Sequence, residues 1–310
     1  MGLRRGGSRV NNTQQAYLSK LQRKLDEGKF AITCEIGPPK GADQEEIKES
    51  ASYLKDLADG INVTDLQSSV MRMGSLTTCT LLKQWGYEPV LQMTTRDRNR
   101  LMIQSDLLSA YVMGIRNVLA LTGDYTNIGD HPQTKPVYDL DSVQLLWTIK
   151  TLEEGKDLVG NDLTCSPQFF KGAVVNPGAD SEAAYELQII KMKKKIIMGA
   201  QFFQTQAIFD AETFKRFMER MEKEKINVPI LAGIILLKSK GMANYMNKFV
   251  PGVFVPNNLI ERMDKTDDKV ATCIEIASEL INEVKPYCSG IHIQALGWEK
   301  HIPSIVANIR

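Results

Sequence analysis

The feature that most constrains this chain is a regular alternation, from about residue 30 onward, between short apolar segments and longer amphipathic ones. The apolar segments are 30–35, 61–64, 89–93, 117–121, 172–175, 200–204, 228–235 and 291–294. Amphipathic segments lie near 44–58, 71–86, 99–113, 139–153, 181–198, 211–225, 239–248 and 268–286. Strands that are apolar almost throughout indicate a parallel sheet with both faces covered. About eight strand–helix units in one chain favour a closed (β/α)8 barrel.

An open doubly wound sheet is the alternative, but it usually carries a glycine-rich GxGxxG turn after an early strand. No such motif occurs in this sequence. We therefore predict an α/β protein with a (β/α)8 TIM barrel over residues 29–310. Residues 1–28 are expected to form an N-terminal arm and a helical extension, in which Leu18, Leu21 and Leu25 give one apolar stripe.

Composition excludes several classes of function. With 38 Lys and Arg against 37 Asp and Glu, the net charge is +1, which argues against a nucleic-acid partner. No apolar run approaches the ~20 residues that span a membrane. The five cysteines are scattered and never spaced as CxxC, which predicts reduced thiols in a cytoplasmic protein. The three histidines are not paired on a helix face, so we expect no zinc site or other metal site.

The connection between the fourth and fifth predicted strands is long and runs from residue 121 to residue 172. Its two parts, 124–140 and 153–170, are rich in Gly, Pro, Asn and Asp. Long loops in barrels of this kind often cover an active site, although a tolerated surface insertion explains the same composition equally well.

Catalytic groups in such barrels come from the carboxyl ends of the strands. The residues expected there are polar and mostly uncharged: Glu35, Thr64, Asp65, Gln92, Thr94, Asp124, Asn176, Gln206 and Gln294. They include no Cys–His pair and no lysine suited to a Schiff base. Such a set suits a cofactor that is held by hydrogen bonds, together with one or two acids.

Two carboxyl groups are candidates for the acids. Glu35 ends an apolar strand before Gly37-Pro38-Pro39, and an apolar barrel mouth would favour its protonated form and a role as general acid. Asp124 follows Thr122-Gly123, where glycine permits close approach of a ring or a phosphate. A Glu that pairs with a helix N-terminus and an Asp that caps a turn explain the same positions equally well.

At these strand ends the sequence resembles the methylenetetrahydrofolate reductases, across about residues 28–310. The matching landmarks are Cys34-Glu35-Ile36-Gly37-Pro38-Pro39, Asn62-Val63-Thr64, Gln92-Met93-Thr94, Leu121-Thr122-Gly123-Asp124, Val175-Asn176-Pro177, Thr205-Gln206 and Ala232-Gly233-Ile234. Each match is weak alone, but their order and their coincidence with strand ends are specific.

The resemblance implies roles for individual residues. Glu35 matches the proton donor that helps to open the bridging methylene of the folate, and Asp124 matches an acid near both flavin and pterin. Gln206 matches a glutamine that contacts folate. Flavin contacts are implied for Thr64, Gln92, Thr94, Asp124, Val175 and Asn176. The implied reaction is the reduction of 5,10-methylenetetrahydrofolate to 5-methyltetrahydrofolate through a flavin, either FAD or FMN.

The sequence departs from the family pattern at three places. Gln92 replaces a histidine of well-studied bacterial members, and Ile36-Gly37 replaces an aromatic pair. The segment Ile234–Gly241 lacks the aromatic residue against which a nicotinamide dinucleotide folds. This pattern is similar to reductases of anaerobic one-carbon metabolism. It implies a second, electron-transferring subunit, which would carry its own metal or iron–sulfur centre because this chain has no CxxC spacing.

Two other functions are compatible with the sequence. One is a flavin-free, pterin-binding methyltransferase barrel that passes methyl groups to a corrinoid protein. The other is a non-catalytic folate-binding subunit of a redox complex. Flavin absorbance of the purified protein would exclude the methyltransferase and would weaken the case for a non-catalytic subunit.

Overall fold

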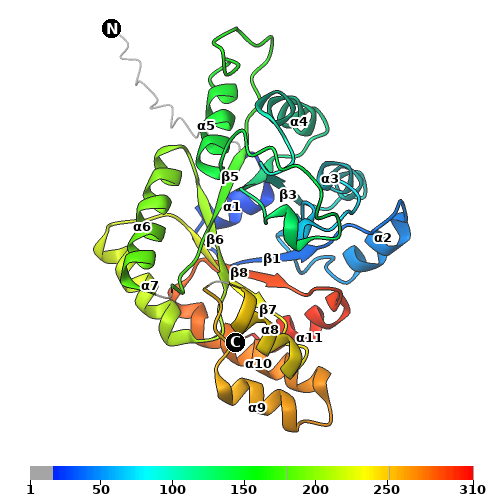
Figure 1. Ribbon diagram of the computed structural model, residues 1–310, viewed down its shortest axis with the longest axis vertical. Helices are drawn as coiled ribbons and strands as arrows, with labels where there is room; N and C mark the ends of the chain where they lie inside the picture. Colours follow the sequence, from blue (N-terminus) through cyan, green and yellow to red (C-terminus); the bar gives the residue numbers. More distant parts are fainter. Residues whose placement is uncertain (1–16, 180, 251, 310) are drawn as a thin grey trace, which may run out of the picture.

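The computed structural model describes residues 17–179, 181–250 and 252–309. Eight parallel strands close into a barrel in the order β1 to β8, with β1 paired to β8, and helices surround it (Figure 1). The predicted (β/α)8 barrel is thus confirmed. The strands are β1 Ala31–Ile36, β2 Gly60–Val63, β3 Pro89–Thr94, β4 Asn117–Leu121, β5 Phe170–Val175, β6 Phe202–Ala207, β7 Ile230–Ile235 and β8 Gly290–Gln294.

The helices follow the amphipathic segments. They are α1 Lys20–Asp26, α2 Gln44–Ser52, α3 Ser75–Gln84, α4 Arg100–Val112, α5 Ser142–Glu153, α6 Glu182–Ile197, α7 Ala211–Lys223, α8 Lys240–Phe249, α9 Asn257–Lys265, α10 Lys269–Val284 and α11 Ile302–Ala307. Most begin at a side chain that caps the first turn, as Asp141 does with Gln144 in a capping box at α5. None of the described helices is both long enough and apolar enough to cross a membrane.

The side chains of each strand alternate between the helices and the barrel interior. In β1, Cys34 and Ile36 pack outward into the main hydrophobic core, next to Ile47 and Ala51 of α2. Burial raises the pKa of the Cys34 thiol, so this cysteine is a packing residue and not a thiolate. The neighbouring Glu35 lies on the opposite face of β1, the face that lines the barrel.

The amino end of the barrel is closed by an apolar plug. Leu18 of the predicted apolar stripe is half-buried and precedes the helix, whereas Leu21 and Leu25 of α1 are buried. They belong to one cluster with inward-facing residues of six strands: Ala31, Val90, Leu119, Phe170, Phe202 and Leu231. Lys24 also pairs with Asp59 over 2.7 Å. The helix begins at Lys20 with Ser19 as its N-cap, and residues 1–16 lie outside the described residues.

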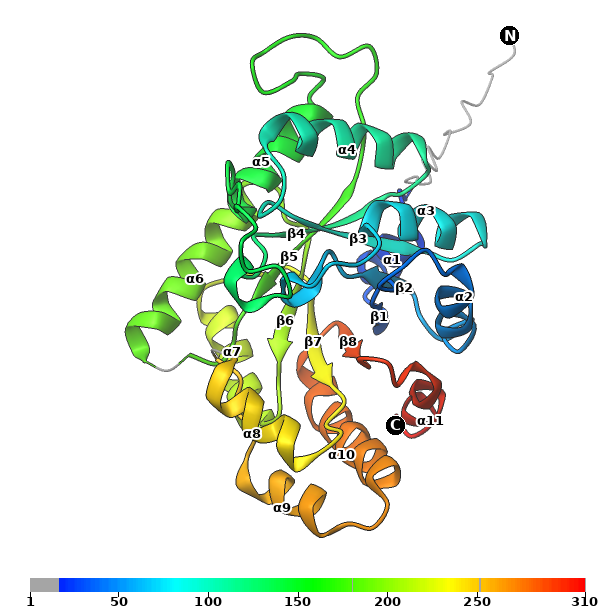
Figure 2. The same ribbon diagram turned by 45° about the vertical axis from the view of Figure 1, so that its right-hand side comes forward.

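The long connection between β4 and β5 divides into two parts with different positions. Residues 122–141 follow the carboxyl end of β4 and lie beside the loop after β2 (Figures 1 and 2). Residues 154–169 follow α5 and lead into the amino end of β5. Only the first part is therefore placed to cover the barrel mouth.

Three helices, α8, α9 and α10, follow β7 where two were expected, and α9 is the additional one. α8 and α9 lie beyond the carboxyl ends of β6 and β7 (Figure 2). Their apolar faces form a second small core, which includes Met246 of α8, Met263 of α9 and Phe209 after β6. Asn247 closes the turn between them, with hydrogen bonds to both the N–H and the carbonyl of Val255.

Candidate functional site at the barrel mouth

The mouth of the barrel, at the carboxyl ends of the strands, holds a buried carboxyl group. Glu35 of β1 is only 7% exposed. Gln92 Nε2 of β3 donates a hydrogen bond to Glu35 Oε2 over 3.0 Å, and His292 Nε2 of β8 lies 3.6 Å from the same oxygen. The surroundings of Glu35 are therefore polar, whereas the sequence led us to expect an apolar pocket.

Below Glu35, a buried polar layer crosses the barrel. Asn62 and Gln204 exchange two hydrogen bonds, of 2.9 and 3.2 Å, and Gln204 Nε2 also donates to Thr33 Oγ1 over 3.3 Å. Thr33 Oγ1 donates to the carbonyl of Ile291 and lies 3.0 Å from His292 Nδ1. Because the hydroxyl hydrogen is committed to that carbonyl, we assign the imidazole hydrogen to Nδ1.

This assignment leaves the Nε2 lone pair of neutral His292 facing Glu35 Oε2. His292 Nε2 lies 3.6 Å from Glu35 Oε2, and the hydrogen bond from Gln92 orients the carboxyl group. The arrangement suits the transfer of a single proton to a ligand above β1.

Thr64, at the end of β2, has a hydroxyl group that needs a partner. Its side chain is 2% exposed, and Oγ1 has no hydrogen-bond partner among the described residues. A buried hydroxyl left unpaired costs about 1–3 kcal/mol, so such an atom at a mouth indicates a ligand contact. Gly37 lies across from it, where even an added Cβ would stand 3.8 Å from Thr64 Oγ1.

Thr94 is committed to the protein framework. Its N–H and its Oγ1 both donate to Asp65 Oδ2, over 2.8 and 2.9 Å. Arg98 Nη1 lies 2.6 Å from the same oxygen, and Ser75 Oγ donates to Asp65 Oδ1. The carboxyl group of Asp65 thus joins the ends of β2 and β3 and is fully used in doing so.

Asp124 lies on the rim of the mouth, in the loop that follows β4. Its side chain is exposed, and Oδ2 accepts a hydrogen bond of 2.9 Å from the N–H of Ser68. Its carbonyl accepts from Tyr138 Oη over 3.0 Å and from Arg96 Nη1 over 3.3 Å. Within the described residues, no contact joins Asp124 to Glu35.

The remaining predicted residues lie on the β5–β6 side. Gln206 is half-buried at an irregularity in the β6–β7 pairing, and bulges of this kind re-aim side chains near active sites. Asn176 Oδ1 accepts the N–H of Gly178 over 3.0 Å. Val175 packs outward into the main core, so its backbone rather than its side chain is available to a ligand.

Sequence reasoning missed two residues of this site, His292 and Arg96. His292 was considered only as a metal ligand on a helix, although its position two residues before Gln294 on a strand places both on one face. Arg96 is 1% exposed and contacts the loops that follow β2 and β4. Nothing in the local sequence marks an arginine directly after a strand as buried.

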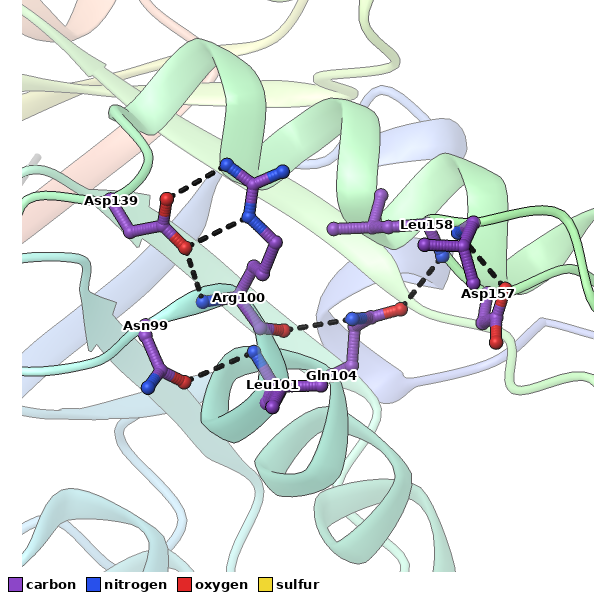
Figure 3. Close-up of a pocket in the computed structure, with 8 residues that line it drawn as sticks. Asn99, Arg100, Leu101, Gln104, Asp139, Asp157 and Leu158 are labelled. Atoms are coloured by element: carbon purple, nitrogen blue, oxygen red, sulfur yellow. Dashed lines mark hydrogen bonds and ion pairs between the residues drawn. The ribbon is translucent and has the colours of Figure 1, made fainter.

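A pocket with a volume of about 330 Å³ lies away from the mouth, between the start of α4 and the loop after α5 (Figure 3). Arg100, Asp139, Gln104 and Leu158 line it. Its polar groups are paired with one another, as in the Arg100–Asp139 ion pair of 2.7 Å. In the described residues, no group of three or more His, Cys, Asp or Glu side chains could hold a metal ion.

The residues at the mouth fit a flavin better than a metal. Thr64 has a buried hydroxyl without a partner among the described residues, and the amides of Gln92 and Asn176 contact Glu35 and Gly178. Together with the closed barrel, they define a class: an α/β-barrel protein with an organic-ligand site at the carboxyl ends of its strands.

The chain belongs to the methylenetetrahydrofolate reductase family, whose family model matches residues 20–310. It is 26% identical to a probable methylenetetrahydrofolate reductase (NADPH) of Caenorhabditis elegans, over 94% of this chain and 44% of the relative. It is 28% identical to 5,10-methylenetetrahydrofolate reductase of Pectobacterium carotovorum, over 79% of this chain and 77% of the relative. The chain thus spans less than half of the nematode relative's length.

A solved structure shares the fold. It is an uncharacterized protein from Clostridium thermocellum, described as binding two copies of 5-methyl-5,6,7,8-tetrahydrofolic acid. The TM-score is 0.64 at 18% identity, covering 94% of this chain and 97% of that one.

Proposed function

We propose that this chain reduces 5,10-methylenetetrahydrofolate to 5-methyltetrahydrofolate with a bound flavin, and that Glu35 is the proton donor. The observation that carries the proposal is the buried Glu35 at the mouth, with His292 Nε2 at 3.6 Å and Gln92 at 3.0 Å. Membership of the reductase family supports the same reaction.

Glu35 protonates the folate nitrogen whose bond to the bridging methylene carbon then breaks, which leaves that carbon as an iminium. His292 Nε2 lies 3.6 Å from Glu35 Oε2 and backs the carboxyl group from below. A bound flavin supplies the hydride that the iminium carbon accepts. Thr64, Gln92 and Asn176 hold and orient the flavin, and the amide of Gln206 binds the folate. General acid catalysis of this kind contributes about 10²–10⁴-fold to a rate.

We also propose that electrons reach the site through a second protein subunit. After β7, Leu236 and Leu237 are buried, and Lys238 hydrogen-bonds the carbonyl of Leu296. These side chains give no aromatic surface on which a nicotinamide ring could stack. A protein donor would instead approach the barrel mouth and would bring its own metal or iron–sulfur centre.

The test is anaerobic purification followed by a visible spectrum and a reoxidation assay. We expect flavin absorbance that reduced viologen bleaches and that 5,10-methylenetetrahydrofolate restores, with 5-methyltetrahydrofolate as the product. A colourless protein that transfers the methyl group of 5-methyltetrahydrofolate to a corrinoid would contradict the proposal in favour of a methyltransferase. A colourless protein that only binds folate would contradict it in favour of a binding subunit.

A further inference from the structure

Arg96 stands out because a fully charged side chain is almost wholly buried next to the mouth. It follows β3 directly, and its side chain is 1% exposed. The guanidinium pairs with Asp97, at 3.0 Å from Nε and 2.7 Å from Nη2. Burying a charge in this way needs well-placed partners, since the cost of removing it from water is large.

The remaining contacts of Arg96 join two loops of the mouth. Nη2 donates to the carbonyl of Leu66 in the loop after β2 over 3.2 Å, and Nη1 donates to the carbonyl of Asp124 over 3.3 Å. The Arg96 backbone donates to Thr122 and accepts from Val137. One residue therefore contacts both arms of the loop 122–141 and the loop that follows β2.

The loop after β2 has a strained backbone conformation, which its contacts with Arg96 and Asp124 stabilise. Leu66, Ser68 and Ser69 have φ angles of 50°, 55° and 56°, in the left-handed region that residues with a Cβ rarely adopt. Asp124 Oδ2 accepts the N–H of Ser68. Gly129 approaches so closely that an added Cβ would lie 1.9 Å from the carbonyl oxygen of Ser69. The two loops are thus fixed against each other.

This arrangement defines the orientation of the Asp124 carboxyl group. Arg96 holds the Asp124 carbonyl, and Ser68 holds Oδ2. Oδ1 has no hydrogen-bond partner within the part of the chain that the structure describes, and the side chain is exposed to solvent. A carboxylate with one oxygen anchored and the other open can accept an N–H from a ligand ring without first being ordered.

We propose that Arg96 is a positioning residue for folate: by fixing the Asp124 backbone and the Leu66–Ser69 segment, it presents Asp124 Oδ1 to the N–H groups of the pterin ring. The inference rests on the proposed function. It deepens that function by assigning folate affinity to a residue that is itself buried beneath the rim.

The chain offers a matched control in Arg100. Like Arg96, Arg100 connects the region that follows β3 to the loop 122–141. Its Nε and Nη2 lie 2.9 and 2.7 Å from the two oxygens of Asp139 (Figure 3). Arg100 is half-exposed and contacts neither Asp124 nor Leu66. Arg100→Met therefore removes an arginine tether from the same loop while leaving the Arg96 contacts in place.

The experiment titrates the flavin-loaded protein with 5-methyltetrahydrofolate and follows the change in flavin absorbance. We compare wild type, Arg96→Met, Arg96→Lys and Arg100→Met, with flavin content and melting temperature measured on each. We expect Arg96→Met to raise Kd about tenfold or more, which is ~1.4 kcal/mol. Arg96→Lys should recover part of that loss, since one ammonium replaces some of the donors. Arg100→Met should stay within about twofold of wild type.

Each outcome of the folate titration supports or overturns the inference about Arg96. If Arg96→Met keeps its flavin and binds 5-methyltetrahydrofolate as tightly as wild type, the inference is overturned while the proposed function stands. If Arg96→Met yields no folded flavoprotein, Arg96→Lys decides, and an unchanged Kd in that variant overturns the inference. Wild-type protein that holds flavin but binds no folate would overturn the proposed function and the inference together.

Discussion

At the scale of single residues, the chemistry proposed here depends on the carboxyl group of Glu35. The carboxyl group is buried, oriented by Gln92, and backed by an imidazole whose other nitrogen faces Thr33. This polar layer is unusual for a barrel interior, which is ordinarily filled by branched apolar side chains. It places a proton source at the mouth without exposing it to bulk water.

Replacing Glu35 by glutamine tests that role. Glutamine keeps the size of the side chain and an oxygen that can accept the hydrogen bond from Gln92, so we expect a folded, flavin-loaded protein. It cannot donate an acidic proton, so turnover of methylenetetrahydrofolate should fall at least ~100-fold. The measurement is steady-state turnover, with flavin reduction by viologen as the control that should survive. Normal turnover in Glu35→Gln would show that the proton comes from elsewhere.

Asp124→Asn separates the charge of Asp124 from its structural hydrogen bond. The amide oxygen of asparagine can still accept from the N–H of Ser68, so the loop should keep its conformation. Loss of a negative charge near the flavin should raise its reduction potential, by about 30 mV if the interaction is worth ~1.4 kcal/mol in a two-electron couple. Folate turnover should change as well. A redox titration that gives wild-type potential, together with wild-type turnover, would leave Asp124 a loop residue only.

The site was predictable from the sequence where one residue acts alone at a strand end. Glu35 and Thr64 were identified because an apolar strand leads directly to a polar side chain. Whether Thr94 is available to a ligand could not be predicted in this way, because its hydroxyl donates to Asp65. The position of Asp65 depends in turn on its ion pair with Arg98, and thus on how two loops pack. Arg96 was missed for the same reason, because its partners come from loops far apart in the sequence.

At the scale of elements, the strands were predicted to within a few residues because near-continuous apolar runs leave little choice of structure. β4 was predicted at its observed bounds, whereas β6 begins at Phe202 rather than at residue 200. α9 was not predicted. Its apolar residues, such as Met263, pack into the second core above β6 and β7 rather than against the barrel, and no strand follows it directly to mark a repeat.

The packing of α6 against β5 gives a prediction about pH. Lys195 of α6 is buried and donates to the carbonyl of Val174 over 2.7 Å. Burial, and to a smaller extent Lys191, lowers the pKa of Lys195 from 10.5 to about 8, while Asp141 acts in the opposite direction. That shift corresponds to ~3 kcal/mol between the two protonation states. The folded protein therefore binds fewer protons than the unfolded chain between about pH 8 and pH 10.5, and this contribution to stability rises with pH.

Lys195→Met removes this dependence. We compare the free energy of unfolding of Lys195→Met with that of wild type at each pH. The difference should favour the variant by about 2 kcal/mol more at pH 7 than at pH 10, because only wild type bears the buried ammonium at the lower pH. Urea unfolding at the two pH values measures the difference. Lys194→Met, at the exposed neighbouring position, serves as the control and should show no such change. A difference between Lys195→Met and wild type that is independent of pH would mean that Lys195 does not titrate in this range.

At the scale of the whole molecule, the proposed function makes the barrel mouth the surface at which both folate and an electron donor arrive. We expect the isolated chain to be reduced slowly by NADH and NADPH, because the buried Leu236 and Leu237 after β7 replace an aromatic platform whose stacking is worth about 1 kcal/mol. Stopped-flow absorbance of the flavin measures this, with reduced viologen as the positive control. Rapid reduction by either nicotinamide in the absence of another protein would remove the need for a partner subunit.

The apolar plug formed by α1 has a consequence for the order of events in turnover. Leu21 and Leu25 seal the amino end of the barrel, so a flavin at the mouth has one approach and no rear entrance. A bulky protein donor and a folate cannot both occupy that approach, and each must leave before the other binds. Reciprocal plots of initial rate against folate concentration, at several fixed concentrations of the donor, should therefore be parallel lines. Lines that converge would mean that folate and donor are bound at the same time.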